Sequence, residues 1–174
     1  TGTHRSMSRT MCGKAIPASG GGPANEHNYT AGLRLYSHLT GDERARKAVL
    51  GLADWVIAMD DGEQHLLGLA SGAATGYASM TSEPAYHGPG RGAGNSVHAL
   101  LDGWLAGGDV RYLRQADALI RRTVHPHDDL AARTLDNAEL RWSYTVYLQA
   151  LARFIELTAG IERLGSVGEY ARRS

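Results

Sequence analysis

Three short segments of the sequence gather the side chains that could carry out chemistry. The first holds Glu26, His27, Asn28 and Tyr29, the second holds Tyr86, His87, Arg91, Asn95 and His98, and the third holds Glu139, Arg141, Trp142 and Tyr144. Imidazole, phenol, guanidinium and carboxylate groups are the common acids, bases and anion ligands of proteins. The mixture is richer in Asn, Arg, His and Tyr than in carboxylates, which suggests chemistry on an acidic sugar.

β-Elimination from a uronic acid needs three roles, and the first two are a neutraliser and a base. Asn28, Asn95 and Arg91 are of the types that neutralise a uronate carboxylate. His27 or His87 could take the sugar proton near neutral pH, because imidazole titrates in that range. We therefore predict His27 and His87 as catalytic candidates.

The third role is an acid that protonates the leaving oxygen. Tyr29, Tyr86 and Tyr144 are suitable types, and Tyr29 and Tyr144 join the histidines as catalytic candidates. Substrate contacts are expected from the remaining polar and aromatic residues of the three segments, namely Glu26, Asn28, Tyr86, Arg91, Asn95, His98, Glu139, Arg141 and Trp142. Aromatic rings among polar groups suit a pyranose, which has an apolar face and a polar edge.

Two other functions compete with a lyase. Glycoside hydrolysis usually needs two carboxyl groups, which Glu26 and Glu139 would supply. The third possibility is a non-catalytic helical-repeat module that binds glycan or protein. Structural explanations also stand beside the chemical ones: Asn28 and Asn95 suit helix N-caps, and His98 suits a helix core.

Hydrophobic periodicity predicts an all-α fold. Residues 1–24 read as an irregular segment, and residues 25–174 read as one domain of helical hairpins. Expected helices cover residues 29–39, 42–59, 95–106, 109–124, 138–158 and 161–172, with a loop over 82–94. Gly41 and Gly108 suit helix C-termini, while Asp42 and Asp109 suit the caps of the helices that follow.

An internal repeat relates the first two hairpins. A shift of 67 residues places Asn28 on Asn95, Leu33 on Leu100, Gly41-Asp42 on Gly108-Asp109 and Arg44 on Arg111. Repetition of one unit predicts stacked antiparallel hairpins whose first helices run parallel. The three polar segments would then meet at one end of the stack.

Composition excludes several classes of partner. The chain has 174 residues, of which 43% are hydrophobic and 21% charged, and 18 basic residues balance 18 acidic ones. This balance argues against a nucleic-acid or anionic-membrane partner. No apolar run approaches a membrane span, and the single cysteine, Cys12, excludes an internal disulfide framework.

Motifs for cofactors are weak. Gly88, Gly90, Gly92 and Gly94 lack the preceding β-strand of a dinucleotide fingerprint. The segment His125-Pro126-His127-Asp128-Asp129 has metal-ligand residue types, but it reads better as a polar helix stop. We expect no cofactor and no metal.

The stretch from Gly20 to Thr158 resembles part of an (α/α) toroid of the carbohydrate-active kind. The resemblance rests on Asn25-Glu26-His27-Asn28-Tyr29, on the two Gly-Asp helix turns and on the segment from Tyr86 to Asn95. It is similar in style to heparinase II/III-like lyases, unsaturated glucuronyl hydrolases and β-L-arabinofuranosidase-type proteins, and to uncharacterised bacterial proteins.

The resemblance implies half of an (α/α)6 toroid acting on acidic oligo- or polysaccharide. A toroid has about twice as many helices as this chain supplies. We therefore expect either a homo-oligomer or a larger chain that completes the structure. A soluble protein of the cytoplasm or periplasm is expected, with the compartment left open.

Overall fold

A computed structural model of the protein describes residues 25–61, 77–79, 88–133, 137–159, 161 and 168–174. Its elements are η1 (Asn25–His27), α2 (Ala31–Thr40), α3 (Glu43–Asp61), η2 (Tyr77–Ser79), α5 (Arg91–Gly107), α6 (Arg111–Thr123), α7 (Ala138–Arg141), α8 (Tyr144–Thr158) and α9 (Glu169–Arg173). The described ranges contain no β-strand, which confirms the predicted all-α class. The predicted irregular segment 1–24 lies outside these ranges.

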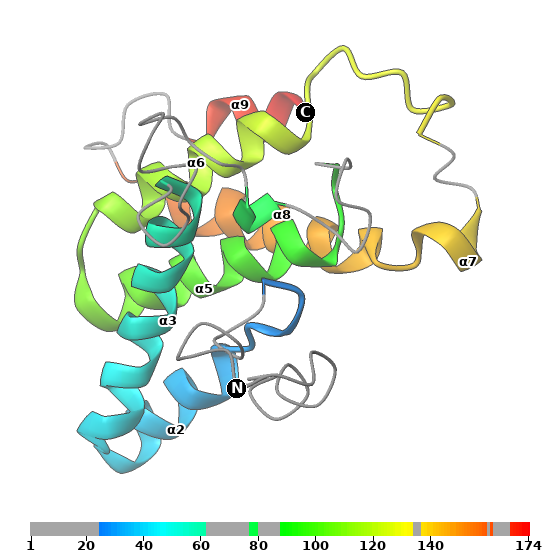
Figure 1. The fold of residues 1–174 in the computed structure, drawn as a ribbon. Helices are drawn as coiled ribbons and strands as arrows, with labels where there is room; N and C mark the ends of the chain where they lie inside the picture. The colour runs from blue at the N-terminus through cyan, green and yellow to red at the C-terminus, as the bar shows by residue number, and fades with distance from the viewer. Residues whose placement is uncertain (1–24, 62–76, 80–87, 134–136, 160, 162–167) are drawn as a thin grey trace.

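Helix α5 lies at the centre of the structure, and α2, α3, α6, α8 and η1 all contact it (Figure 1). Eleven of its residues are buried, from Gly92 to Val97 and from Ala99 to Gly103. Small and apolar residues on nearly every side of a helix are typical of an interior position. The second predicted hairpin therefore supplies the axis on which the other helices pack.

The main hydrophobic core joins four helices through fully buried side chains. Leu100 and Leu101 of α5 pack in one cluster with Val56 of α3, Leu119 of α6 and Phe154 of α8. Apolar residues spaced three or four apart predict one inward face for α6, and Leu113, Ala116, Ile120 and Val124 on that face are all buried. The same spacing predicts an inward face for α3, which is buried at Ala45, Val49 and Val56 and half-buried at Leu52 and Met59.

The two Gly-Asp turns have the same geometry, as the repeat predicts. Gly41 and Gly108 have φ angles of 70° and 75°, in the left-handed region that glycine adopts without strain. Asp42 accepts the backbone N–H of Arg44 at 2.8 Å, and Asp109 accepts that of Arg111 at 2.9 Å. The similarity confirms the predicted helix ends at Gly41 and Gly108, and it comes from interactions among neighbours in the chain. The predicted cap at Asp109 is wrong by one residue, because Val110 is the N-cap residue of α6.

The start of α5 differs from the prediction. We expected a loop through Gly94, but the helix begins at Arg91 and includes Gly92, Ala93 and Gly94. A Cβ atom at Gly94 would lie 3.0 Å from the backbone of Tyr147 in α8. Glycine is therefore used here for close packing of two helices, and a single sequence cannot distinguish this use from loop flexibility.

The predicted helix 138–158 is two helices in the structure. Helix α7 ends at Arg141, and α8 begins at Tyr144 after a turn at Trp142 and Ser143. The backbone N–H and the hydroxyl of Thr145 both donate to the carbonyl of Trp142, at 3.3 Å and 2.8 Å. These contacts tighten the chain into a turn, so the predicted continuous helix was wrong.

Helix α2 packs weakly, although its sequence predicts an apolar face. It has no buried residue, and Leu35, Tyr36 and Leu39 are all at least half exposed. This face leaves an apolar surface, as expected at the open end of a helical stack. Within the described ranges, no helix combines the length and apolarity that crossing a membrane requires.

Candidate functional site

A pocket of about 370 Å³ lies where the beginnings of α2 and α5 meet α8. It is lined by Asn28, Tyr29, Thr30, Ala31, Gly32, Arg34, Asn95, His98 and Arg153. Four of these residues, Asn28, Tyr29, Asn95 and His98, belong to the predicted site. We call this cavity the α2–α5 pocket.

The carboxylate of Asp102 holds the charged wall of the α2–α5 pocket in place. Its side chain is fully buried in α5 and accepts the hydroxyl of Thr30 at 2.6 Å. It also accepts Nε of Arg34 at 2.7 Å and Nη2 of Arg153 at 2.5 Å. A buried carboxylate needs such partners, because an unpaired charge in the interior is strongly unfavourable. Asp102 therefore orients two guanidinium groups from two different helices.

His98 is a neutral imidazole whose hydrogen bond with Arg153 fixes which ring nitrogen carries the proton. Its Nδ1 lies 3.2 Å from Nη1 of Arg153, and a guanidinium can only donate, so Nδ1 must accept. The remaining ring proton is therefore on Nε2. Burial lowers the pKa of His98, the positive charge of Arg153 lowers it further, and Asp102 acts in the opposite direction.

Asn28 lines the same pocket and is almost completely buried. The residue is 1% exposed, and its Nδ2 donates a long hydrogen bond of 3.5 Å to the carbonyl of Leu52. Its Oδ1 is buried and has no hydrogen-bond partner among the described residues. Such an atom is costly to leave unpaired in a folded protein, and its burial means that a ligand would reach it only after a local shift of the pocket wall. The predicted N-cap role of Asn28 is not seen, because Thr30 is the N-cap residue of α2.

The predicted pair His27 and Tyr29 lies at the edge of the α2–α5 pocket. Their rings contact edge to face, with centroids 6.2 Å apart. Tyr29 is 51% exposed and lines the pocket, whereas His27 is half-buried and is not among its lining residues. An exposed phenol thus stands at the rim with an imidazole beside it.

Beside the pocket, Glu26, Arg91 and Trp142 bring together all three predicted segments. Arg91 forms an ion pair with Glu26 at 2.9 Å, and its guanidinium lies 5.3 Å from the centre of the Trp142 ring. Asn95 donates to the backbone carbonyl of Glu26 at 2.9 Å. Asn95 lies inside α5, so it joins η1 to α5 and is not an N-cap. The first two segments and Trp142 therefore meet at the beginning of α5, which is part of the gathering that the repeat predicts.

Other predicted residues lie elsewhere. Tyr144 stacks on Tyr147, with ring centroids 6.5 Å apart, and lines a separate cavity of about 70 Å³. Arg141 donates to the carbonyl of Arg133 at 3.3 Å, and Glu139 is exposed on α7. Tyr86 and His87 lie outside the described residues. The single predicted cluster is thus realised around the first two segments and Trp142.

Sequence reasoning missed Thr30, Arg34, Asp102 and Arg153. One signal was available for Asp102, which directly follows Leu100 and Leu101 in a helix made mostly of small and apolar residues. Charged residues are almost never fully buried unless they are paired. The partners carried no such signal, because Arg34 and Arg153 stand on amphipathic helices like any solvated arginine.

No metal cluster accompanies the α2–α5 pocket: within the described ranges, no group of three or more His, Cys, Asp or Glu side chains could hold an ion. Comparisons with protein-family models, with curated proteins and with solved structures found no match to this chain. The geometry of the pocket is therefore the basis for a functional argument.

Proposed function

We propose that the protein binds an acidic sugar, of the uronic acid type, in the α2–α5 pocket. The observation that carries the proposal is the pairing of Arg34 and Arg153 through one buried carboxylate, Asp102, at the pocket wall. Two guanidiniums against one carboxylate leave an excess of positive charge. Each guanidinium also keeps N–H groups beyond those that contact Asp102, and such groups bind carboxylates well.

The other lining groups favour a sugar over a simple anion. Nε2–H of His98 is a further donor at the pocket wall. Tyr29 offers an exposed ring to the apolar face of a pyranose. A volume of about 370 Å³ is within the range of small-molecule sites.

A matched pair of arginine variants tests the binding proposal. Arg34 and Arg122 each pair with a fully buried aspartate, Asp102 or Asp60, and have similar exposure of 33% and 30%. Only Arg34 lines the pocket. Calorimetric titration with glucuronate should show roughly tenfold weaker binding for Arg34→Gln and unchanged binding for Arg122→Gln.

The methyl ester of glucuronate provides the second control, since it removes the charge and keeps the ring. We expect the ester to bind much more weakly than glucuronate. Equal binding of acid and ester, or equal losses in Arg34→Gln and Arg122→Gln, would contradict the proposal.

β-Elimination of the bound uronide is a second candidate function. Its support is the ring contact between His27 and Tyr29 at the rim, which places a base and an acid of suitable types together. His98 suits this role less well, because its only lone pair already accepts from Arg153. Elimination would make an unsaturated uronide with a strong ultraviolet absorbance, and His27→Ala should abolish its appearance from polyuronides.

Hydrolysis by Glu26 and Glu139 has less support. Glu26 forms an ion pair with Arg91, and neither glutamate lines the α2–α5 pocket. Release of reducing ends without ultraviolet absorbance, lost in Glu26→Gln and Glu139→Gln, would favour hydrolysis over both other functions.

A further inference from the structure

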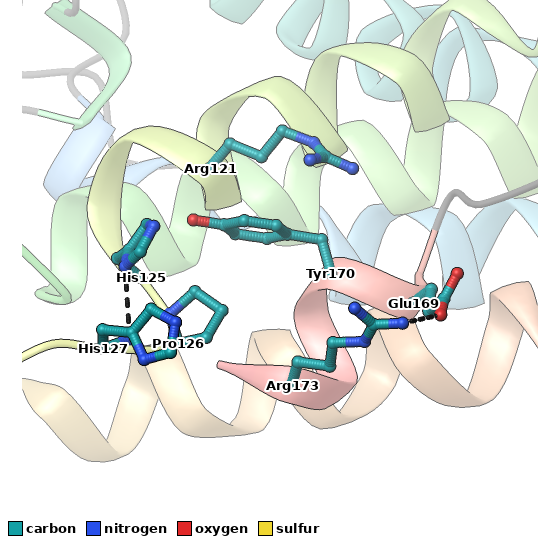
Figure 2. A pocket seen from close by; sticks show the side chains of 7 residues that line it. All are labelled: Arg121, His125, Pro126, His127, Glu169, Tyr170 and Arg173. Carbon is teal, nitrogen blue, oxygen red and sulfur yellow. Dashed lines mark hydrogen bonds and ion pairs between the residues drawn. The ribbon is translucent and has the colours of Figure 1, made fainter.

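A second pocket, of about 340 Å³, lies where the C-terminal end of α6 meets α9 (Figure 2). Arg121 comes from α6, His125, Pro126 and His127 from the turn that follows it, and Glu169, Tyr170 and Arg173 from α9. None of these residues lines the α2–α5 pocket. Two guanidiniums and two imidazoles thus face one small cavity with a single carboxylate.

The side chain of Tyr170 is held in this cavity by a hydrogen bond and by a cation–π contact. Its hydroxyl donates to the carbonyl of Val124 at 2.8 Å, and the guanidinium of Arg121 lies 4.4 Å from its ring centre. In Figure 2, Arg121 covers one side of the ring, and Arg173 lies on the other side. Arg121 also donates from Nε to Asp117 at 2.8 Å, which leaves its two Nη groups as donors.

The histidines favour an anion over a metal ion. Nδ1 of His125 accepts the backbone N–H of His127 at 3.2 Å, so the proton of the neutral ring is on Nε2. Metal binding at Nε2 would require loss of that proton, and binding at Nδ1 would break the turn. This arrangement agrees with the prediction that the segment His125-Pro126-His127-Asp128-Asp129 is a polar helix stop.

Glu169 is the one lining group that opposes an anion. It is paired with Arg173 one turn later in α9, and both side chains are more than half exposed. The pair uses Nη2 of Arg173 and leaves Nε and Nη1 as donors. A ligand with more negative charge than a single carboxylate would compete with Glu169 for this guanidinium.

We propose that this second pocket, between α6 and α9, binds the phosphate group of a small phosphate monoester. A phosphate dianion has enough charge to compete with Glu169 for Arg173 and accepts several hydrogen bonds, while Arg121, on the opposite side of the Tyr170 ring, adds positive charge nearby. The cavity is larger than a phosphate group alone. The ring of Tyr170 and the side chain of Pro126 give the remainder of the ligand an apolar surface.

Two variants, each of which removes one charge of the Glu169–Arg173 ion pair, test this proposal. Glu169→Gln and Arg173→Gln both remove the same exposed contact, so any loss of α9 stability is shared. Binding of phenyl phosphate and of inorganic phosphate is measured by calorimetry at about pH 8, where phosphate is a dianion. We expect Arg173→Gln to weaken binding roughly three- to fivefold and Glu169→Gln to strengthen it by a similar factor.

Arg44→Gln is the control for non-specific attraction, because Arg44 is highly exposed and pairs with Asp42 far from this pocket. Its affinity should equal that of the unchanged protein. Stronger binding of phenyl phosphate than of inorganic phosphate would support the apolar contact. The proposal is overturned if Glu169→Gln and Arg173→Gln change the affinity in the same direction, if Arg44→Gln weakens it equally, or if neither probe binds.

Discussion

Arg153 determines where His98 carries its proton. Nη1 of Arg153 lies 3.2 Å from Nδ1 of His98, while Nη2 of the same guanidinium is bound to Asp102. The buried carboxylate therefore positions the arginine, and the arginine fixes the tautomer of the histidine. One network sets both the charge and the donor pattern of the α2–α5 pocket.

This network predicts a loss of stability in mild acid. Burial lowers the pKa of His98, with Arg153 as the second cause, whereas an unfolded histidine titrates near about 6.5. As the pH falls through that value, the unfolded chain binds a proton that folded His98 resists, so the free energy of unfolding decreases. Urea unfolding at about pH 7.5 and 5.5 should show a smaller decrease for His98→Gln. An equal decrease in both proteins would contradict this explanation.

Asp102 is predicted to be the most sensitive polar residue of the pocket. Asp102→Asn leaves Arg34 and Arg153 without their carboxylate and should cost about 3 kcal/mol of unfolding free energy. Asp54→Asn is the control, because Asp54 pairs with Arg111 at an exposed position and should cost about 1 kcal/mol or less. Denaturant titration measures both, and equal losses would argue against a buried network.

The contact between α5 and α8 predicts opposite effects of two glycine substitutions. Gly94→Ala would place a Cβ atom 3.0 Å from the backbone of Tyr147, which cannot move without shifting α8. We expect a loss of about 2 kcal/mol or more from this overpacking. Gly51→Ala in α3 meets nothing within 4 Å and should stabilise the helix by roughly 0.5–1 kcal/mol. Thermal unfolding checks the signs, and stabilisation by Gly94→Ala would refute the close approach.

The buried phenol of Tyr147 leads us to predict a loss of folding stability at alkaline pH. Burial raises the pKa of its phenol, and the hydrogen bond with Thr123 at 2.5 Å acts in the opposite direction. Above about pH 10 the unfolded chain loses this proton and the folded protein keeps it, so stability falls as the pH rises. Tyr147→Phe should lose less stability between about pH 8 and 10.5, as denaturant titration at each pH would show. A steeper loss in Tyr147→Phe would contradict the assignment.

Local features of the fold were predictable because neighbours in the chain produce them. The ends of α2 and α5 depend on Gly41 and Gly108, and Asp42 and Asp109 each accept a backbone N–H near the start of the next helix. The spacing of apolar residues along α6 is enough to identify the face of the helix that is buried. The all-α class and the two hairpins follow from such short-range interactions.

The site depended on contacts between residues far apart in the sequence. Asp102 meets Thr30, Arg34 and Arg153 across separations of 72, 68 and 51 residues. An arginine on an amphipathic helix has the same pattern whether it is solvated or bound to a buried carboxylate. The residue types around Asn28, Tyr29, Asn95 and His98 could thus be singled out, but their charged partners could not.

The sequence by itself determined the all-α class, the buried faces of α3 and α6 and the glycine turns that end α2 and α5, since each rests on backbone geometry and hydrophobic spacing. Only the tertiary structure decided that Gly94 serves helix packing, that Tyr144 faces a different cavity, and that Asp102 organises the pocket. The physical reason is that packing and burial set distances and charge states among distant residues. No local pattern in the chain encodes those quantities.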